Sequence, residues 1–252
     1  AEDPKASETL VRLGVVDAVL DAMQKYDWDE ELMERCVRLV ATLTYSEIGV
    51  TTIVKRGGIQ TILAAMESHV EEPDFLISAV IALKNIASDV ANINSMGQLG
   101  GVETVLSAMD TCMDDRPLLM EILLLFVRMT RSTPVNEKIA EKGMHILLKS
   151  IHEFDKDPQY LTNAFVLIGH LTFAQKNLKI IVQYGGIALI VDSICNHPET
   201  KELMLKSITT LDNIAMTSPE HANIVKQERG DVTIKEVLGA YSDDAEVVAA
   251  GE

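Results

Sequence analysis

A short segment recurs along the chain at a constant spacing, and this repeat constrains the fold more than any other feature. RLGVVDAVLDAM ends at Met23, KRGGIQTILAAM ends at Met66 and QLGGVETVLSAM ends at Met109, so the offset is about 43 residues each time. Related segments follow with the same spacing once a one-residue deletion near Gly143 is allowed, and they end at Ile151, Ile194 and, in a weaker copy, near Val237.

A second, longer block follows each of these segments and has the periodicity of a helix. In FLISAVIALKNIA, apolar side chains recur at spacings of three and four, which marks one buried stripe: Leu76, Ala79, Val80, Leu83 and Ile86. A proline stands near the start of most of these blocks, where its fixed φ suits a first helical turn: Pro73, Pro117, Pro158 and Pro198. Glycine in the short segment permits a tight corner. Each repeat is therefore predicted to hold a short helix, a glycine corner, a second helix, a loop and a longer third helix.

The glycine corner together with AVIALKNIAS and SITTLDNIAM resembles the signature of the armadillo repeat family. The period lies within the roughly 40 to 47 residues of armadillo and HEAT units, and three helices per unit favour armadillo. The resemblance implies an all-α, right-handed superhelical solenoid. We expect one domain over residues 1–252, with units at about 5–45, 46–88, 89–131, 132–173 and 174–216 and an incomplete unit at 217–252. Because solenoid ends normally carry capping units, the incomplete unit suggests a fragment of a longer array.

The third helices are the candidate binding surface, because in armadillo proteins they line the concave groove that holds extended partner segments. At the position of the family's asparagine, which hydrogen-bonds the partner's main chain, this chain has Asn85 and Asn213. The remaining candidates come from this position in other units and from one and two turns earlier on the same helix face: Arg35, Arg38, Glu121, Arg128, Asn163, His170 and Lys206. Four of these are cations, which favours an acidic ligand segment, although an ordinary solvated surface would also be polar here.

Charge limits the classes of partner. The chain carries 22 Lys and Arg against 38 Asp and Glu, so its formal charge of -16 opposes binding to nucleic acid or to anionic lipid and favours a protein with basic patches. No apolar run approaches the roughly 18 residues that span a bilayer. Cys36, Cys112 and Cys195 lie far apart, which favours a reducing compartment, and we expect a cytoplasmic protein.

Catalytic and metal-binding motifs are absent from the sequence, so we expect no enzyme activity, no cofactor and no metal site. Met23, Met66 and Met109 repeat at one register and are expected in the core, as is Cys36. Trp28 falls in a loop, where it either anchors a partner or folds over the first unit.

The sequence thus predicts a non-enzymatic scaffold that binds an extended segment of another protein, as a monomer or a weak dimer. The alternative is a structural spacer within a long armadillo scaffold. The repeats also resemble those of a large armadillo connector of apicomplexan parasites, and this resemblance implies a link between actin and the tail of a membrane adhesin.

Overall fold

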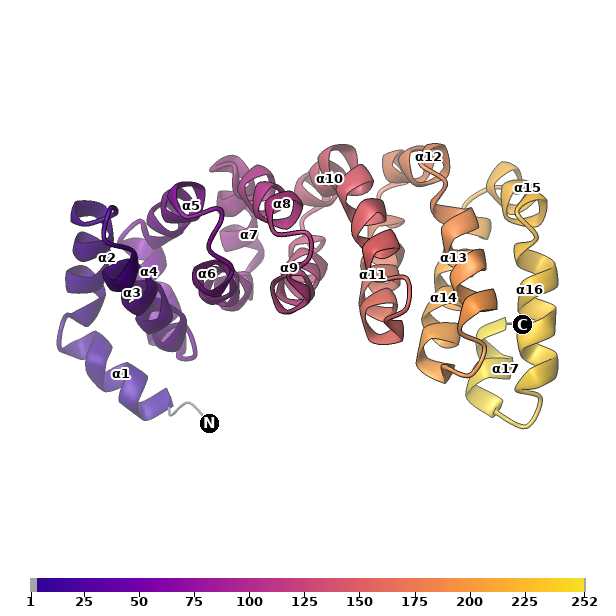
Figure 1. Ribbon diagram of the computed structural model, residues 1–252, viewed down its shortest axis with the longest axis horizontal. Coiled ribbons are helices and arrows are strands. Elements are labelled where there is room, and N and C mark those ends of the chain that lie inside the picture. The colour runs from indigo at the N-terminus through magenta and orange to yellow at the C-terminus, as the bar shows by residue number, and fades with distance from the viewer. Residues whose placement is uncertain (1–3, 252) are drawn as a thin grey trace. The chain divides into compact units, whose positions relative to one another are not determined.

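The computed structural model describes residues 4–251, and its regular elements within that range are all helices (Figure 1). The chain divides into two compact units, the first ending at Val135 and the second beginning at Asn136. The all-α class and the solenoid of short helices predicted from the repeat are confirmed.

The first unit contains three successive sets of three helices. These are α1 (Pro4–Arg12), α2 (Val15–Lys25), α3 (Glu30–Leu43), α4 (Glu47–Lys55), α5 (Gly58–Ser68), α6 (Pro73–Ile86), α7 (Val90–Gln98), α8 (Gly101–Thr111) and α9 (Arg116–Met129). The third helices pack in one series, α3 on α6 and α6 on α9. The second helices pack in another series, α2 on α5 and α5 on α8.

The core of the first unit lies between these two series. Met23, Met66 and Met109 on the second helices are almost fully buried, as predicted, and so is the stripe on α6 that includes Leu76 and Leu83. Side-chain caps define the starts of several helices: Asp29 accepts from the backbone N–H of Leu32 at the start of α3, which satisfies one of the unpaired donors of the first turn.

Glycine forms the corners between first and second helices. Gly57 and Gly100 have φ values of 77° and 84°, in the left-handed region that other residues adopt only with strain. One left-handed residue reverses the chain sharply enough for a second helix to begin at the next residue.

The fourth repeat departs from this pattern, and the expected glycine corner is wrong there. Thr133–Glu153 forms one continuous helix of 21 residues, α10, which runs through Gly143. In register Gly143 corresponds to Gly58 and Gly101, the residues that begin the second helices, so the one-residue deletion removes the left-handed position itself. Without that residue the two helices join into one.

The second unit continues with α11 (Pro158–Leu171), α12 (Gln175–Gln183), α13 (Gly186–Asn196), α14 (Lys201–Ala215), α15 (Pro219–Gln227), α16 (Gly230–Ala240) and α17 (Ala245–Gly251). Helix α14 packs between α11 and α17, and α13 packs on α16. Gly185 forms the corner before α13 with a φ of 75°, whereas Arg229 occupies the left-handed position before α16 with a φ of 64°.

A buried amide pair joins two helices of the second unit. Nδ2 of Asn177 donates to Oδ1 of Asn136 at 2.6 Å and to the carbonyl of Leu171 at 3.0 Å. Asn177 is fully buried, and its own Oδ1 has no hydrogen-bond donor among the described residues. The pair satisfies carbonyls at the end of α11, because Nδ2 of Asn136 also donates to the carbonyl of His170 at 3.0 Å.

Candidate functional site

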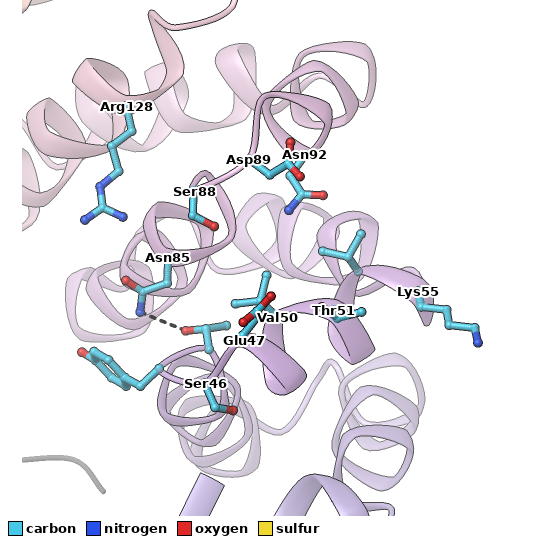
Figure 2. Close-up of a pocket in the computed structure, with 13 residues that line it drawn as sticks. Ser46, Glu47, Val50, Thr51, Lys55, Asn85, Ser88, Asp89, Asn92 and Arg128 are labelled. Atoms are coloured by element: carbon cyan, nitrogen blue, oxygen red, sulfur yellow. Dashed lines mark hydrogen bonds between the residues drawn. The ribbon is translucent and has the colours of Figure 1, made fainter. Parts of the chain in front are cut away.

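A pocket of about 640 Å³ in the first unit brings together two of the residues predicted to bind a partner, Asn85 and Arg128 (Figure 2). It lies where the C-terminal ends of α3 and α6 meet one side of α4, along its whole length, and the N-terminal part of α7, with Arg128 reaching it from α9. The other residues that line it are Thr44, Tyr45, Ser46, Glu47, Val50, Thr51, Val54, Lys55, Ser88, Asp89 and Asn92.

Asn85 is held by its neighbour in the preceding repeat. Its Nδ2 donates to Oγ1 of Thr44 at 3.0 Å (Figure 2). This hydroxyl in turn donates to the carbonyl of Ala41 at 2.6 Å. Thr44 is buried, so the amide plane of Asn85 is oriented by a fixed group. Among the described residues the amide makes this one hydrogen bond, which leaves its oxygen and its second N–H available to a ligand backbone.

Arg128 reaches back from α9 to the end of α6. Its Nη1 donates to the carbonyl of Lys84 at 2.8 Å, and Nη1 of Arg131 donates to the carbonyl of Ser88 at 3.0 Å. The last carbonyls of a helix lack intrahelical partners and carry partial negative charge, so the Arg128 guanidinium stabilises this helix end. The carbonyl that Arg131 contacts belongs to the turn after α6. Arg128 remains exposed and keeps further N–H donors at the pocket.

The other charged candidates in the first unit are offset by nearby charges. Arg35 pairs with Glu31 at 2.5 Å and Arg38 pairs with Glu34, both within α3. Glu121 pairs with Lys84 across α6 and α9 in a part-buried contact. The predicted row of cations is therefore not an unopposed basic strip, and the polar group at the centre of this surface is the Asn85 amide.

The candidates in the second unit lie on α11 and α14, which pack together. Nδ2 of Asn163 donates to the carbonyl of Gln159 at 3.0 Å in its own helix. The part-buried ring of His170 contacts Phe173 edge-on at a centroid distance of 5.8 Å, and burial lowers the pKa of this histidine. Lys206 is exposed and Asn213 is part-buried. A continuous strip through all nine candidates stays a prediction.

Sequence reasoning missed the side of the pocket formed by the first helices. Asp89 accepts from the backbone N–H of Ala91 at 2.8 Å, and Nδ2 of Asn92 donates to the carbonyl of Ile86 at 3.0 Å. The signal for Asp89 and Ser46 is their position as helix N-caps directly after a third helix. These caps place polar atoms in the same pocket as the Asn85 amide.

Two further features of the described residues bear on chemistry. No group of three or more His, Cys, Asp or Glu side chains within residues 4–251 gathers as metal ligands do. Within the same range no single helix is long and apolar enough to cross a membrane, although α12 and α13, bent by 66°, pass that test together on length and composition.

Comparisons with known proteins identify a family from the sequence and a fold from the structure. The family model described as the GAC ARM domain matches residues 7–250. No curated protein matches the chain. A designed armadillo repeat protein has a TM-score of 0.78 at 13% identity, with coverage of 93% of this chain and 95% of that one.

Two other solved structures show the same fold. A chain in a structure from work on a phosphorylation switch that controls the interaction between cadherin and β-catenin has a TM-score of 0.78 at 15% identity, and the match covers 98% of this chain and 46% of that one. A designed armadillo repeat protein in complex with the peptide (KR)4 has a TM-score of 0.74 at 11% identity, covering 93% of this chain and 98% of that one. These identities establish the fold alone, whereas the family match spans almost the whole sequence, and the chain therefore belongs to the GAC ARM domain family.

Proposed function

We propose that this chain is a non-enzymatic scaffold that binds an extended segment of another protein on the face formed by its third helices. The observation that carries the proposal is the Asn85 amide, which is oriented by buried Thr44 and keeps a donor and an acceptor at the edge of the pocket. One amide that both donates and accepts suits a main chain, which offers one N–H and one C=O per residue.

The structural neighbours support this mode of binding. The armadillo fold is commonly a protein-binding scaffold, and a designed member with the same fold is known in complex with the peptide (KR)4. The mixed polar lining of the pocket, which includes Glu47, Lys55, Asp89 and Arg128, favours a segment recognised through its backbone over one selected by a single charge.

The proposal is tested by comparing two variants of the chain in binding. Asn85→Ala combined with Arg128→Ala removes the central polar groups of the pocket, and we expect at least about a tenfold loss of affinity for a partner captured from lysate and then purified. Arg131→Ala is the matched control, because Arg131 also donates to a backbone carbonyl of the preceding repeat, in the turn after α6, but does not itself line the pocket. If both variants bind the partner with the affinity of the parent chain, and their helical content is unchanged, binding occurs elsewhere.

A second candidate function is that of a spacer or connector between actin and a membrane adhesin tail. The match to the GAC ARM domain supports it, because the repeats resemble those of the apicomplexan connector. Co-sedimentation of the purified chain with actin filaments tests the actin contact directly. A chain that stays in the supernatant at every filament concentration would rule out the actin contact.

We include a cytoplasmic location in the proposal, for which the support is chemical. Cys36, Cys112 and Cys195 are all free, and unpaired thiols persist in reducing compartments. Fractionation of the native cell with an antibody to this segment checks the location.

A further inference from the structure

The connection between α2 and α3 presents an aromatic pair to solvent. The Trp28 side chain is 74% exposed and that of Tyr26 is 46% exposed. Their ring centroids lie 6.4 Å apart with an angle of 73° between the ring planes. In an edge-to-face pair one ring uses no face for its partner, so its faces remain open to a ligand.

The fold does not require an aromatic residue at this position. In register with Trp28 the next four repeats have Glu71, Asp114, Lys156 and Glu199, and the sixth has Ser242; each of these lies exposed in the corresponding turn. Four repeats therefore make the same connection with a charged side chain. A large apolar surface kept at such a position, where it gains nothing from burial, indicates a role in contact with another molecule.

The aromatic pair is held in a fixed loop. The backbone N–H of Asp29 donates to the carbonyl of Tyr26 at 3.0 Å, and the Asp29 side chain caps α3. From the next repeat, Nε2 of the buried His69 lies 2.9 Å from the carbonyl of Asp27, and the ring nitrogen is the donor because a carbonyl only accepts. Both ends of the loop and its centre are thus tied down, which lowers the entropy cost of binding there.

The charges around the aromatic pair favour a cationic ligand. Asp27, Glu30 and Glu31 are exposed within three residues of Trp28, against one nearby cation, Lys25. Glu31 is partly offset by Arg35, in an exposed pair that contributes little. The chain as a whole carries a formal charge of -16, so an anionic ligand is opposed both locally and at long range.

The same negative charge continues along the neighbouring loops of the first unit. Sγ of Cys112 lies 3.4 Å from the carbonyl of Val70, and this contact repeats the link that His69 makes to Asp27 one repeat earlier. The two links hold the α2–α3, α5–α6 and α8–α9 connections side by side. We call the exposed carboxylates in these connections and in the first turns of α3 and α6 the acidic edge: Asp27, Glu30, Glu31, Glu71, Asp74 and Asp114.

We propose that Trp28 and Tyr26 anchor a basic segment of another protein, which lies along the acidic edge. The aliphatic stem of a lysine or arginine packs on an open ring face while its charge meets the carboxylates. This surface consists of the loops between second and third helices and of the first turns of α3 and α6. It shares no residue with the pocket around Asn85, so the proposal goes beyond the function proposed above.

The chain carries its own reporter for this contact, because Trp28 is its only tryptophan. A capped peptide of alternating lysine and glycine is the probe, and the same peptide with glutamate in place of lysine is its counterpart. We expect the lysine peptide to change the tryptophan emission in a saturable manner that weakens as salt is raised. The glutamate peptide is expected to cause no change.

Variants separate the aromatic contribution from the charge. Trp28→Glu places at this position the residue type that Glu71 has in the next repeat, and it adds a carboxylate while removing the ring. A purely electrostatic surface would bind the lysine peptide more tightly after this change. The anchor predicts about a tenfold loss instead, measured by calorimetry.

Matched controls address general effects of exposure and charge. Phe173→Ala removes another aromatic side chain that is 74% exposed, and Glu202→Gln removes a carboxylate from the first turn of α14 as Glu30→Gln does from α3. We expect both controls to keep the parent affinity, whereas Glu30→Gln combined with Glu31→Gln weakens binding about fivefold.

Three results would overturn the proposal: no binding of the lysine peptide, unchanged or tighter binding by Trp28→Glu, or an equal loss in Phe173→Ala. Because Asn85→Ala leaves the loops intact, that variant is expected to bind the lysine peptide as the parent does. The two experiments therefore distinguish a failure of the proposed binding at the Asn85 pocket from a failure of the proposed binding at Trp28 and Tyr26.

Discussion

The connection between α7 and α8 and the matching stretch of α10 differ in length by one residue, and their backbones follow different paths. At the first, Gly100 adopts a φ of 84° and α8 begins at the next residue. At the second, the left-handed glycine is deleted, and Thr133–Glu153 continues as one helix through Gly143. The corner of these repeats is therefore a property of one backbone position, and the apolar pattern on either side tolerates both solutions.

Deleting Gly100 is the most direct way to break this comparison, and we expect the largest effect from it. Joining α7 to α8 would rotate the buried Val102, Val105 and Met109 away from their neighbours, so the free energy of unfolding should fall by more than about 3 kcal/mol. Chemical denaturation followed by circular dichroism measures it.

The control for the deletion is Gly100→Asn, because asparagine tolerates the left-handed region and no atom lies within 4 Å of an added Cβ. It should cost less than about 1 kcal/mol. A deletion variant as stable as the parent would mean that the first unit accepts a fused helix as readily as the second does.

The second unit has a buried amide where the first has a part-buried one, and paired substitutions measure the difference. Asn92 and Asn177 both donate through Nδ2 to a carbonyl at the end of the preceding third helix, each at 3.0 Å. Asn177→Leu also leaves Oδ1 of buried Asn136 without this donor, so we expect a loss of about 1–3 kcal/mol. The loss stays toward the lower end because Oδ1 of Asn177 already has no donor among the described residues.

For Asn92→Leu we expect a loss of about 0.5–1.5 kcal/mol, since water can replace the hydrogen bond at the part-buried site. Thermal unfolding of the two variants against the parent checks the order. A larger loss from Asn92→Leu would contradict the account of the amide pair.

The corner before α16 offers a substitution that should stabilise the protein. Arg229 occupies the left-handed position with a φ of 64°, where the other corners have glycine. Arg229→Gly relieves strain of roughly 1–2 kcal/mol, partly offset by the entropy of glycine in the unfolded chain, so a gain of about 0.5–1 kcal/mol is expected. Gly185→Ala should lower the free energy of unfolding by about 1 kcal/mol in the same denaturation assay. If Gly185→Ala instead stabilised the protein, the left-handed φ at these corners would not be a source of strain.

The smallest expected effect is at His170, which occupies in the second unit the repeat position that Asn85 occupies in the first. Burial lowers the pKa of His170, so the unfolded chain binds a proton more readily than the folded one. This contribution to stability is present above the unfolded pKa of about 6.5 and is lost as pH falls through the folded value. In His170→Gln the drop in stability between neutral and mildly acidic pH should shrink by a few tenths of a kcal/mol, because the ring is only part-buried. An unchanged pH profile would contradict it.

The third helices could be predicted from the sequence because their buried faces depend on local periodicity. The stripe through Leu76 and Leu83, and the repeated methionines, specify buried faces without knowledge of the neighbours. The pocket could not be predicted, because Asp89 and Asn92 reach it only through the way α7 begins against the end of α6. Nor could the pairing of Arg35 and Arg38 with their own helix, since several rotamers satisfy the same spacing.

The fused helix α10 marks the other limit of sequence reasoning. The deletion near Gly143 was visible as a shift in register, but register alone does not say whether a corner or a straight helix results. The outcome depends on the left-handed residue, and the remaining glycine sits at the position that is helical in every other repeat, including Gly58 and Gly101.

Hydrogen exchange of the chain with and without a purified partner segment tests the central claim most directly, since it locates binding without any substitution. The account predicts slower exchange in residues 44–55 and 85–92, the two segments that contain most of the residues lining the pocket around Asn85. Protection confined to other segments, with residues 44–55 and 85–92 exchanging as in the free chain, would contradict it.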